Sequence, residues 1–406
     1  MSATNVSAKL AGGGTVAAIA LAVSLPVSTA LDNVLLGLAL LFWLVSGNYA
    51  AKAKAFRHPV AIGCLVYFGV VCIGMAYGSG PLKEGWFYLR KYSDLLFVPV
   101  FLSLFADAKD QSRALNAFAA TMLVILVLSY GLAIGLIPPL SIFKIDAPDP
   151  TVFKLRITHS IMMALGAFLF GQMAERAQDV RMRFFWWAVC AAAVANVLLL
   201  TRSRTGYVVL AFVVGLFLFH KAGRKGLLIA AVLIVAASGS MYMLSPGVRD
   251  RIDLAIDETV AWQHGSTIQT STGIRLNGIA ISLKIVGEHP LLGVGVRSFP
   301  EAYRQQVLGT GLEPTLNPHN QYLLTTAHSG LLGLGALLFL FWQVWRNAVW
   351  IADPSHALLA RALVLTLAVG CLFNSLLIDH TEGLLFVWMT GLLFARAPPP
   401  IPRPVA

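Results

Sequence analysis

A histidine lies where a long polar stretch of the sequence meets an apolar one. His319 follows Asn317-Pro318, and an apolar run starts soon after His319-Asn320. Imidazole gains and loses a proton near neutral pH, so a histidine at such a boundary suits general base catalysis. A structural interpretation stays open, because Asn320 after a proline is also typical of the start of a helix.

The composition indicates which elements must position this histidine. Of the 406 residues, 57% are hydrophobic and 12% are charged, whereas about a quarter of the residues are charged in a soluble domain. We therefore predict an all-α integral membrane protein, since apolar segments that cross a bilayer must be helical. About 12 transmembrane helices are expected, at residues 11–29, 31–48, 59–77, 93–106, 114–137, 157–174, 184–201, 205–220, 226–244, 320–345, 357–377 and 383–396.

The distribution of Lys and Arg predicts how these helices are oriented. Short connections on the side of the two termini hold more Lys and Arg than those on the opposite side, and such residues accumulate on the cytoplasmic face. Residues 1–244 thus carry helices 1–9, and 245–318 form a large, mainly helical outward loop. Residues 319–396 carry helices 10–12, and 397–406 form a cytoplasmic tail.

The net charge of +11 does not indicate a nucleic-acid partner. Most of the excess lies in these cytoplasmic connections, and no arginine-rich tail or basic patch with interleaved aromatic residues occurs. Membrane lipids are the expected partners of these cations.

Three blocks of the sequence form a recognisable set. The first is Thr-Arg-Ser-Arg-Thr-Gly at 201–206, and the second is Gly-Ile-Arg-Leu at 273–276 with Gly-Glu-His-Pro-Leu-Leu-Gly-Val-Gly at 287–295. In the third, His319-Asn320 is followed after nine residues by Gly330 and then by Gly333. The chain in these blocks resembles the bacterial O-antigen ligases, whose signature is His-Asn-x9-Gly-x-x-Gly. That family belongs to a group with the O-antigen polymerases and the bacterial protein O-oligosaccharyltransferases.

The resemblance implies a reaction and a place for it. The reaction would transfer an O-antigen glycan from undecaprenyl pyrophosphate to lipid A-core during lipopolysaccharide biosynthesis. The resemblance implies a glycosyltransferase C-like fold in the bacterial inner membrane, with the active site facing the periplasm and no cofactor. An inverting mechanism without a metal ion agrees with the absence of any Asp-x-Asp pair from the sequence.

The resemblance also assigns roles to residues. His319 is the expected general base, and Asn320 would orient the site or contact a sugar. Arg202, Arg204 and Arg275 would bind the pyrophosphate, because guanidinium groups match phosphate oxygens and stabilise the charge of a leaving group. Arg275 thereby also acts in catalysis. Gly330 and Gly333 are expected to permit close helix packing rather than to contact substrate.

Simpler explanations remain for these cations. Arg202 and Arg204 could reach lipid headgroups, and Arg275 could pair with an acidic residue of the loop. Arg90, Arg156 and His159 are further candidates for substrate binding, with headgroup contacts as the alternative for the two arginines.

Three other functions remain open. The polymerase and the protein O-oligosaccharyltransferase need the same base and pyrophosphate contacts, so residue chemistry does not separate them from a ligase. A secondary transporter or flippase is a different class, in which polar sites lie near the membrane midplane and the halves often repeat. Here the polar residues gather at the outer edge and no repeated motif is found.

Overall fold

The computed structural model describes residues 3–143, 149–244, 246–264 and 270–397, which contain helices and no β-strand. The first residue of the expected loop, 245, and the tail 398–406 lie outside this part. The helices of the first half are α1 (Ala3–Ser24), α2 (Thr29–Val45), α3 (Tyr49–Phe56), α4 (Pro59–Tyr77), α5 (Leu82–Tyr92), α6 (Val98–Leu104), α7 (Ala108–Ala133) and α8 (Arg156–Arg176). Those of the second half are α9 (Val180–Ala195), α10 (Arg204–Leu244), α11 (Pro246–Gln263), α12 (Ser271–Glu288), α13 (Phe299–Val307), α14 (Gln321–Asn347), α15 (Pro354–Gly370) and α16 (His380–Phe394).

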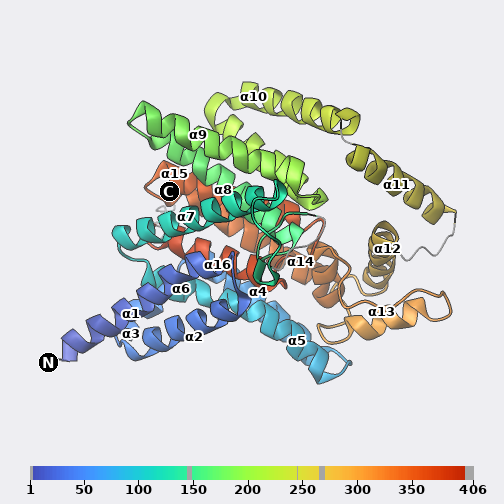
Figure 1. Cartoon of the computed structure of the whole chain (residues 1–406). Helices are drawn as coiled ribbons and strands as arrows, with labels where there is room; N and C mark the ends of the chain where they lie inside the picture. The colour runs from blue at the N-terminus through green and yellow to red at the C-terminus, as the bar shows by residue number, and fades with distance from the viewer. Residues whose placement is uncertain (1–2, 144–148, 245, 265–269, 398–406) are drawn as a thin grey trace, which may run out of the picture.

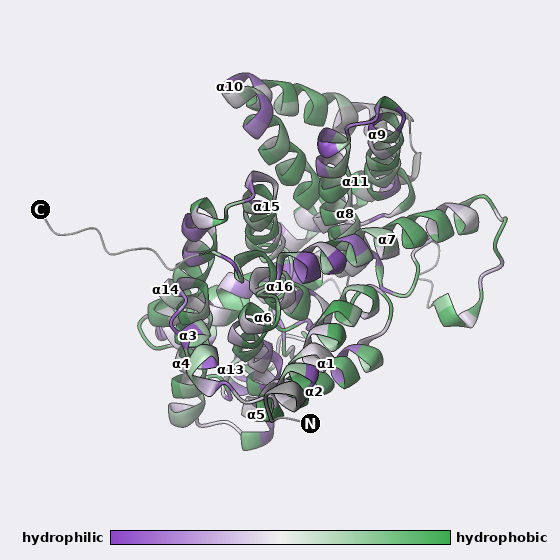
Figure 2. Ribbon diagram, turned by 90° about the vertical axis from the view of Figure 1, so that its left-hand side faces the viewer, coloured by the Kyte–Doolittle hydropathy of each residue, from purple (hydrophilic) through white to green (hydrophobic). Residues whose placement is uncertain are grey.

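The helices form a bundle of mostly hydrophobic residues (Figure 2), and many large apolar side chains are exposed on its outside. Among the described residues, seven helices are long and apolar enough to cross a membrane. Two further helices, Thr29–Val45 and Pro354–Gly370, are also apolar but shorter. The chain is therefore a helical membrane protein, while the expected number of 12 spans stays a prediction.

The expected span at 93–106 is not one helix. Residues Ser93–Phe97 form a 3-10 turn, and α6 adds only Val98–Leu104. Pro99 lies in the first turn of α6. Because the N–H groups of a first turn have no acceptor within the helix, proline loses no hydrogen bond there and favours the start of a new helix. At about 1.5 Å per residue, α6 alone is too short to cross a bilayer.

The centre of the bundle is made by α8 and α16. Every residue from Thr381 to Phe394 is buried, and the sequence of α16 is apolar all around, which is typical of a helix enclosed by others. Trp388, fully buried in α16, donates from Nε1 to the carbonyl oxygen of Ala18 at 2.7 Å.

The predicted turn between 220 and 226 is confirmed inside α10. Gly223 has a φ of 56°, and a Cβ at Gly226 would lie 1.9 Å from the carbonyl oxygen of Leu218. The chain therefore turns sharply here. Beyond it, α11, α12 and α13 lie together at one side of the molecule, next to α14 (Figure 1). These three helices lie within 245–318, the segment that was expected to be mainly helical.

Helix α14 is broken within the signature sequence. Ser329 and Gly330 have non-helical dihedral angles, with a φ of 60° at Gly330. The break frees the carbonyl oxygens of Ala327 and His328, which accept from the backbone N–H groups of Val294 at 2.9 Å and Gly295 at 3.0 Å.

Gly330 is the residue that this break requires. A Cβ there would lie 2.1 Å from the carbonyl carbon of Leu291, so only glycine fits. The expectation of close packing at Gly330 is confirmed, although the partner is the segment at 290–295 rather than a second helix.

Candidate active site

His319 lies directly before the first turn of α14, at what we call the His319 end of the bundle. Asn320 is the N-cap of α14, since its Oδ1 accepts from Leu323 N at 3.0 Å. Its Nδ2 donates to the carbonyl oxygen of Leu372 at 3.0 Å. The capping interpretation therefore holds for Asn320, whose side-chain oxygen and nitrogen both form hydrogen bonds with the backbone.

The side chain of His319 takes no part in this cap. Its backbone is left-handed, with a φ of 55°, which is uncommon for a residue other than glycine. Such strained residues persist where the surroundings hold them, and they are frequent at functional sites. His319 is half-buried, and its backbone N–H donates to Asn317 Oδ1 at 2.9 Å.

The connection between α15 and α16 encloses the segment around His319. Asn317 Oδ1 also accepts from Ser375 Oγ at 2.7 Å. The backbone N–H of Gln321 donates to the carbonyl oxygen of Cys371 at 2.9 Å, and Leu377 N donates to Gln321 Oε1 at 3.1 Å. Two chain segments far apart in sequence thus fix the position of His319 by direct hydrogen bonds.

A chain of hydrogen bonds defines which ring nitrogen of His319 is free. Asn374 Nδ2 lies 3.2 Å from Asp379 Oδ2 and donates to it. The amide oxygen of Asn374 therefore faces His319 Nδ1, at 3.2 Å. Because an amide oxygen only accepts, Nδ1 carries the proton and Nε2 is left as the basic nitrogen.

Asp379 lies within electrostatic range of Lys91 and His319. Burial raises the pKa of Asp379, while Lys91 and His319 lower it in part. Asp379 is therefore linked to His319 through Asn374.

Asn374 itself was not among the sequence candidates. It lies in an apolar stretch, Cys-Leu-Phe-Asn-Ser-Leu-Leu, with no catalytic spacing around it. The sequence placed it inside the expected span 357–377, so a polar residue in an apolar stretch was the only available signal; in the structure α15 ends earlier, at Gly370.

The block at 201–206 forms a compact turn before α10. Thr201 Oγ1 donates to the carbonyl oxygens of Asn196 and Val197 at 3.2 and 3.0 Å, which closes a short π-helical turn, Asn196–Leu200. Ser203 Oγ accepts from Gly206 N at 3.1 Å and so caps α10. A Cβ at Gly206 would lie 2.4 Å from the Ser160 side chain, so this glycine lets α10 touch α8.

This close approach helps to bring three arginines together. Arg204 starts α10, Arg156 starts α8, and Arg275 lies in the first turns of α12. Burial, followed by the nearby charges of Arg204 and Arg156, lowers the pKa of Arg275. Arg204 also donates to Thr272 Oγ1 at 3.5 Å. Since like charges repel, such a cluster favours an anionic ligand.

Helix α12 joins the arginine cluster to His319. A Cβ at Gly278 would lie 3.3 Å from Cα and from the carbonyl oxygen of Pro318. Arg275 precedes Gly278 by one helical turn, and His319 follows Pro318 directly. The proposed base and the three arginines therefore lie on adjoining segments at the same end of the bundle.

Arg202 has a different setting. Its Nε lies 3.6 Å from Asp149 Oδ1, and its backbone N–H donates to Asp149 Oδ2 at 3.3 Å. The Asp149 side chain is 0% exposed, so its charge needs a partner. This ion pair gives Arg202 a structural role that was not anticipated.

The two remaining candidates lie elsewhere. His159 is buried in α8, where its Nε2 lies 3.0 Å from Asn196 Oδ1, and Asn196 Nδ2 donates to Ser129 Oγ at 2.8 Å. Arg90 is exposed in α5, within electrostatic reach of His380. Neither is placed beside Arg275 by a described contact.

The comparison with protein families covers the central part of this site. Residues 188–338 match a family model described as O-antigen ligase. The matched segment contains Arg204, Arg275 and His319, whereas Asn374 and Asp379 lie beyond it.

The search of curated proteins gave no match.

Proposed function

We propose that this protein is an O-antigen ligase, which transfers a glycan from undecaprenyl pyrophosphate to lipid A-core at the periplasmic face of the inner membrane. The observation that carries the proposal is that His319, with a free Nε2, adjoins a cluster formed by Arg156, Arg204 and Arg275. A base beside an anion site is what displacement of a pyrophosphate by a hydroxyl requires.

The proposed reaction is an in-line displacement. His319 Nε2 takes the proton of the acceptor hydroxyl while that oxygen bonds to the anomeric carbon of the glycan. The bond from this carbon to the pyrophosphate oxygen breaks at the same time, which inverts the configuration. The three arginines stabilise the negative charge that develops on the leaving pyrophosphate.

Protein groups supply the roles that this chemistry needs. Asn374 and Asp379 hold the His319 tautomer, and general base catalysis typically contributes about 10²–10⁴-fold. The arginines replace a divalent metal as the electrophile, so we expect the transfer to proceed in EDTA.

The proposal is tested with the purified protein, a lipid-linked glycan and three acceptors offered separately. The acceptors are lipid A-core, a second lipid-linked glycan and an acceptor protein, and the products are separated by gel electrophoresis. We expect glycan on lipid A-core, at the same rate with EDTA. Transfer to the second lipid-linked glycan would instead indicate a polymerase, and transfer to the protein an O-oligosaccharyltransferase.

The His319→Ala variant tests the role of the base. We expect its transfer rate to fall by at least about 100-fold, with unchanged insertion into the membrane. If the wild-type protein flips lipid across vesicles without transferring glycan, and the variant loses this flipping, the transporter interpretation replaces the enzyme. A wild-type rate of transfer would remove His319 from the mechanism.

A further inference from the structure

A cavity of about 770 Å³ opens between α1, α2, α3 and α6, close to the C-terminal end of α16. It lies at the end of the bundle opposite to His319. Helix α4 begins beside the cavity at His58, and Gly63 packs against Leu340 and Gln343 near the C-terminal end of α14. His319 precedes the other end of α14. The cavity is therefore separate from the candidate active site.

The charges that line this cavity all have the same sign. Three cationic side chains contribute, Lys52, Lys54 and Arg57, and the lining that the structure describes includes no acidic residue. The acidic residue next in sequence to the lining is Asp107, whose carboxylate caps α7 by accepting from Lys109 N at 2.7 Å. The cavity thus presents a positive surface of the kind that attracts anions.

Lys52 shows that this positive charge is built into the wall. Its side chain is only 8% exposed. Its Nζ donates to the carbonyl oxygen of Trp43 and to Ser46 Oγ, the latter at 3.0 Å. The ammonium group also lies 4.9 Å from the ring centre of Trp43 and 5.0 Å from that of Tyr49. These partners are all neutral, so they hold the cation in place without cancelling its charge.

The remainder of the wall is apolar. Trp43, Leu102 and Leu104 line it, together with alanines of α1 and α3. Lys54, in α3, and Arg57, at the C-cap of α3, are exposed at the mouth. A phospholipid would match both the basic mouth and the apolar wall, with its phosphate at the mouth and its hydrocarbon chain along the wall.

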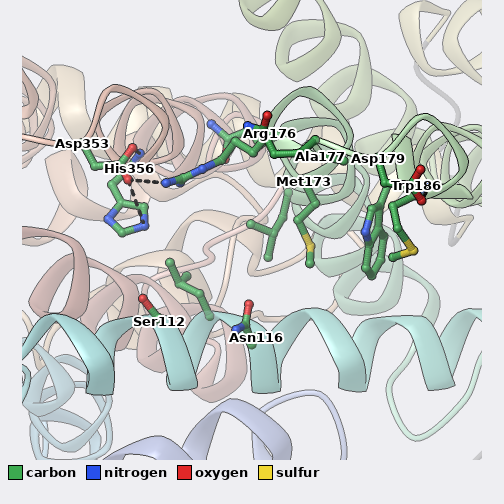
Figure 3. A pocket seen from close by; sticks show the side chains of 14 residues that line it. Ser112, Asn116, Met173, Arg176, Ala177, Asp179, Trp186, Asp353 and His356 are labelled. Carbon is green, nitrogen blue, oxygen red and sulfur yellow. Dashed lines mark hydrogen bonds and ion pairs between the residues drawn. The ribbon is translucent and has the colours of Figure 1, made fainter. Parts of the chain in front are cut away.

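A second cavity at this end of the bundle provides a contrast. It has a volume of about 460 Å³ and is lined by residues of α7, α8, α9 and α15. Its Arg176 donates to Asp353 at 2.8 Å, and His356 lies 4.0 Å from the same carboxylate (Figure 3). Because this arginine is already paired, that cavity lacks the unbalanced positive charge of the first.

We propose that the first cavity binds the phosphate headgroup of an anionic membrane phospholipid. Basic pockets between membrane helices recognise such headgroups on the cytoplasmic side, which is the side that the Lys and Arg distribution predicts for residues 52–58. The alkyl part of the lipid contacts Trp43 and Leu102, and the phosphate contacts Lys54 and Arg57. The proposal does not depend on the glycan-transfer reaction.

The test compares two double variants of the full-length protein by native mass spectrometry in detergent. Lys54→Gln with Arg57→Gln removes the two exposed cations of the cavity. Lys109→Gln with Arg113→Gln is the matched control, because it removes two exposed cations of α7 that do not line the cavity. Each protein is titrated with phosphatidylglycerol, with phosphatidylcholine and with sodium phosphate, and the bound molecules are counted.

We expect wild type and the control to retain one tightly bound phosphatidylglycerol that phosphatidylcholine does not replace. The cavity variant should bind it about 10-fold more weakly. Equal weakening in the control, equal binding of phosphatidylcholine, or displacement of the lipid by sodium phosphate at comparable concentration would each overturn the proposal. The last result would assign the cavity to a free phosphate instead.

Discussion

His319 and its neighbours show how single side chains set up a base. The orientation of the imidazole is set by the left-handed backbone of His319 and by the hydrogen bond from Nδ1 to Asn374. Asp379 is hydrogen-bonded to Asn374 and orients its amide by accepting from Nδ2. Asn374 is therefore a positioning residue, and the free Nε2 is a consequence of three side chains together.

The Asn374→Ala substitution tests this arrangement. Without the amide oxygen, the imidazole can adopt the other tautomer and turn, so we expect kcat for transfer to fall about 10- to 100-fold with little change in KM for the donor. The Ser375→Ala variant is the control, because it loses a hydrogen bond of the same connection without touching His319. If both variants lose the same activity, the effect is structural.

The two arginines of the block at 201–206 are predicted to have different roles, Arg204 in catalysis or donor binding and Arg202 in stability. Arg204 belongs to the cluster around Arg275, so Arg204→Ala should raise KM for the lipid-linked donor or lower kcat by about 10-fold or more. Arg202 pairs with buried Asp149, so Arg202→Ala should mainly lower the unfolding temperature in detergent. Steady-state kinetics and thermal unfolding of both proteins check this, and the reverse pattern would contradict the assignment.

At the scale of elements, the break in α14 and the contact of α12 with Pro318 position the site. Both depend on glycines whose absent Cβ allows a backbone to approach. Gly278 admits Pro318, and Gly330 admits Leu291 while adopting a φ of 60°. These residues act by packing, as the sequence predicted for Gly330, and they bring the base and the arginines onto adjoining segments.

The Gly330→Ala substitution tests the break. The positive φ is unfavourable for alanine, by about 1–2 kcal/mol, and its Cβ would overlap Leu291. We therefore expect a lower unfolding temperature and loss of transfer. Gly335→Ala is the control within the same helix, since a Cβ there meets nothing within 4 Å and alanine favours helix. Equal stability of the two variants would show that the break is not required.

The sequence was sufficient for some elements and not for others. The polar turn near Gly223 and the helices of the outward loop followed from apolar periodicity and glycine. The short α6 did not, because residues 95–106 are predominantly apolar and their composition does not reveal the 3-10 turn. The partnership of His319 with Asn374 was also hidden, since it arises only when α14, α15 and α16 pack together. The ion pair of Arg202 with Asp149 was missed for the same reason.

At the scale of the whole molecule, the two ends of the bundle carry different chemistry. One end holds His319 and the arginine cluster, and the other holds the cavity with Lys52, Lys54 and Arg57. The distribution of Lys and Arg predicts that the first end faces the periplasm and the second the cytoplasm.

Labelling of single cysteines checks this orientation. In a background with Cys64, Cys72, Cys190 and Cys371 changed to alanine, Glu313→Cys lies at an exposed position of the outward loop and Lys54→Cys at the opposite end. A maleimide that enters the periplasm but does not cross the inner membrane should label Glu313→Cys in intact cells. It should label Lys54→Cys only after the inner membrane is opened. The opposite result would invert the topology.

The break in α14 also divides the helix into two parts that share one partner. Residues 331–347 form a helix of about 26 Å, close to the thickness of a bilayer core. The part from Gln321 to His328 is bonded to the segment at 290–295 and to the α15–α16 connection, and across the break Leu331 and Leu332 donate to the carbonyl oxygens of Pro290 and Leu291. When a thinner or thicker bilayer tilts the longer part, we expect these bonds to transmit the tilt to the segment at 290–295, so that bilayer thickness can act on the His319 end of the bundle.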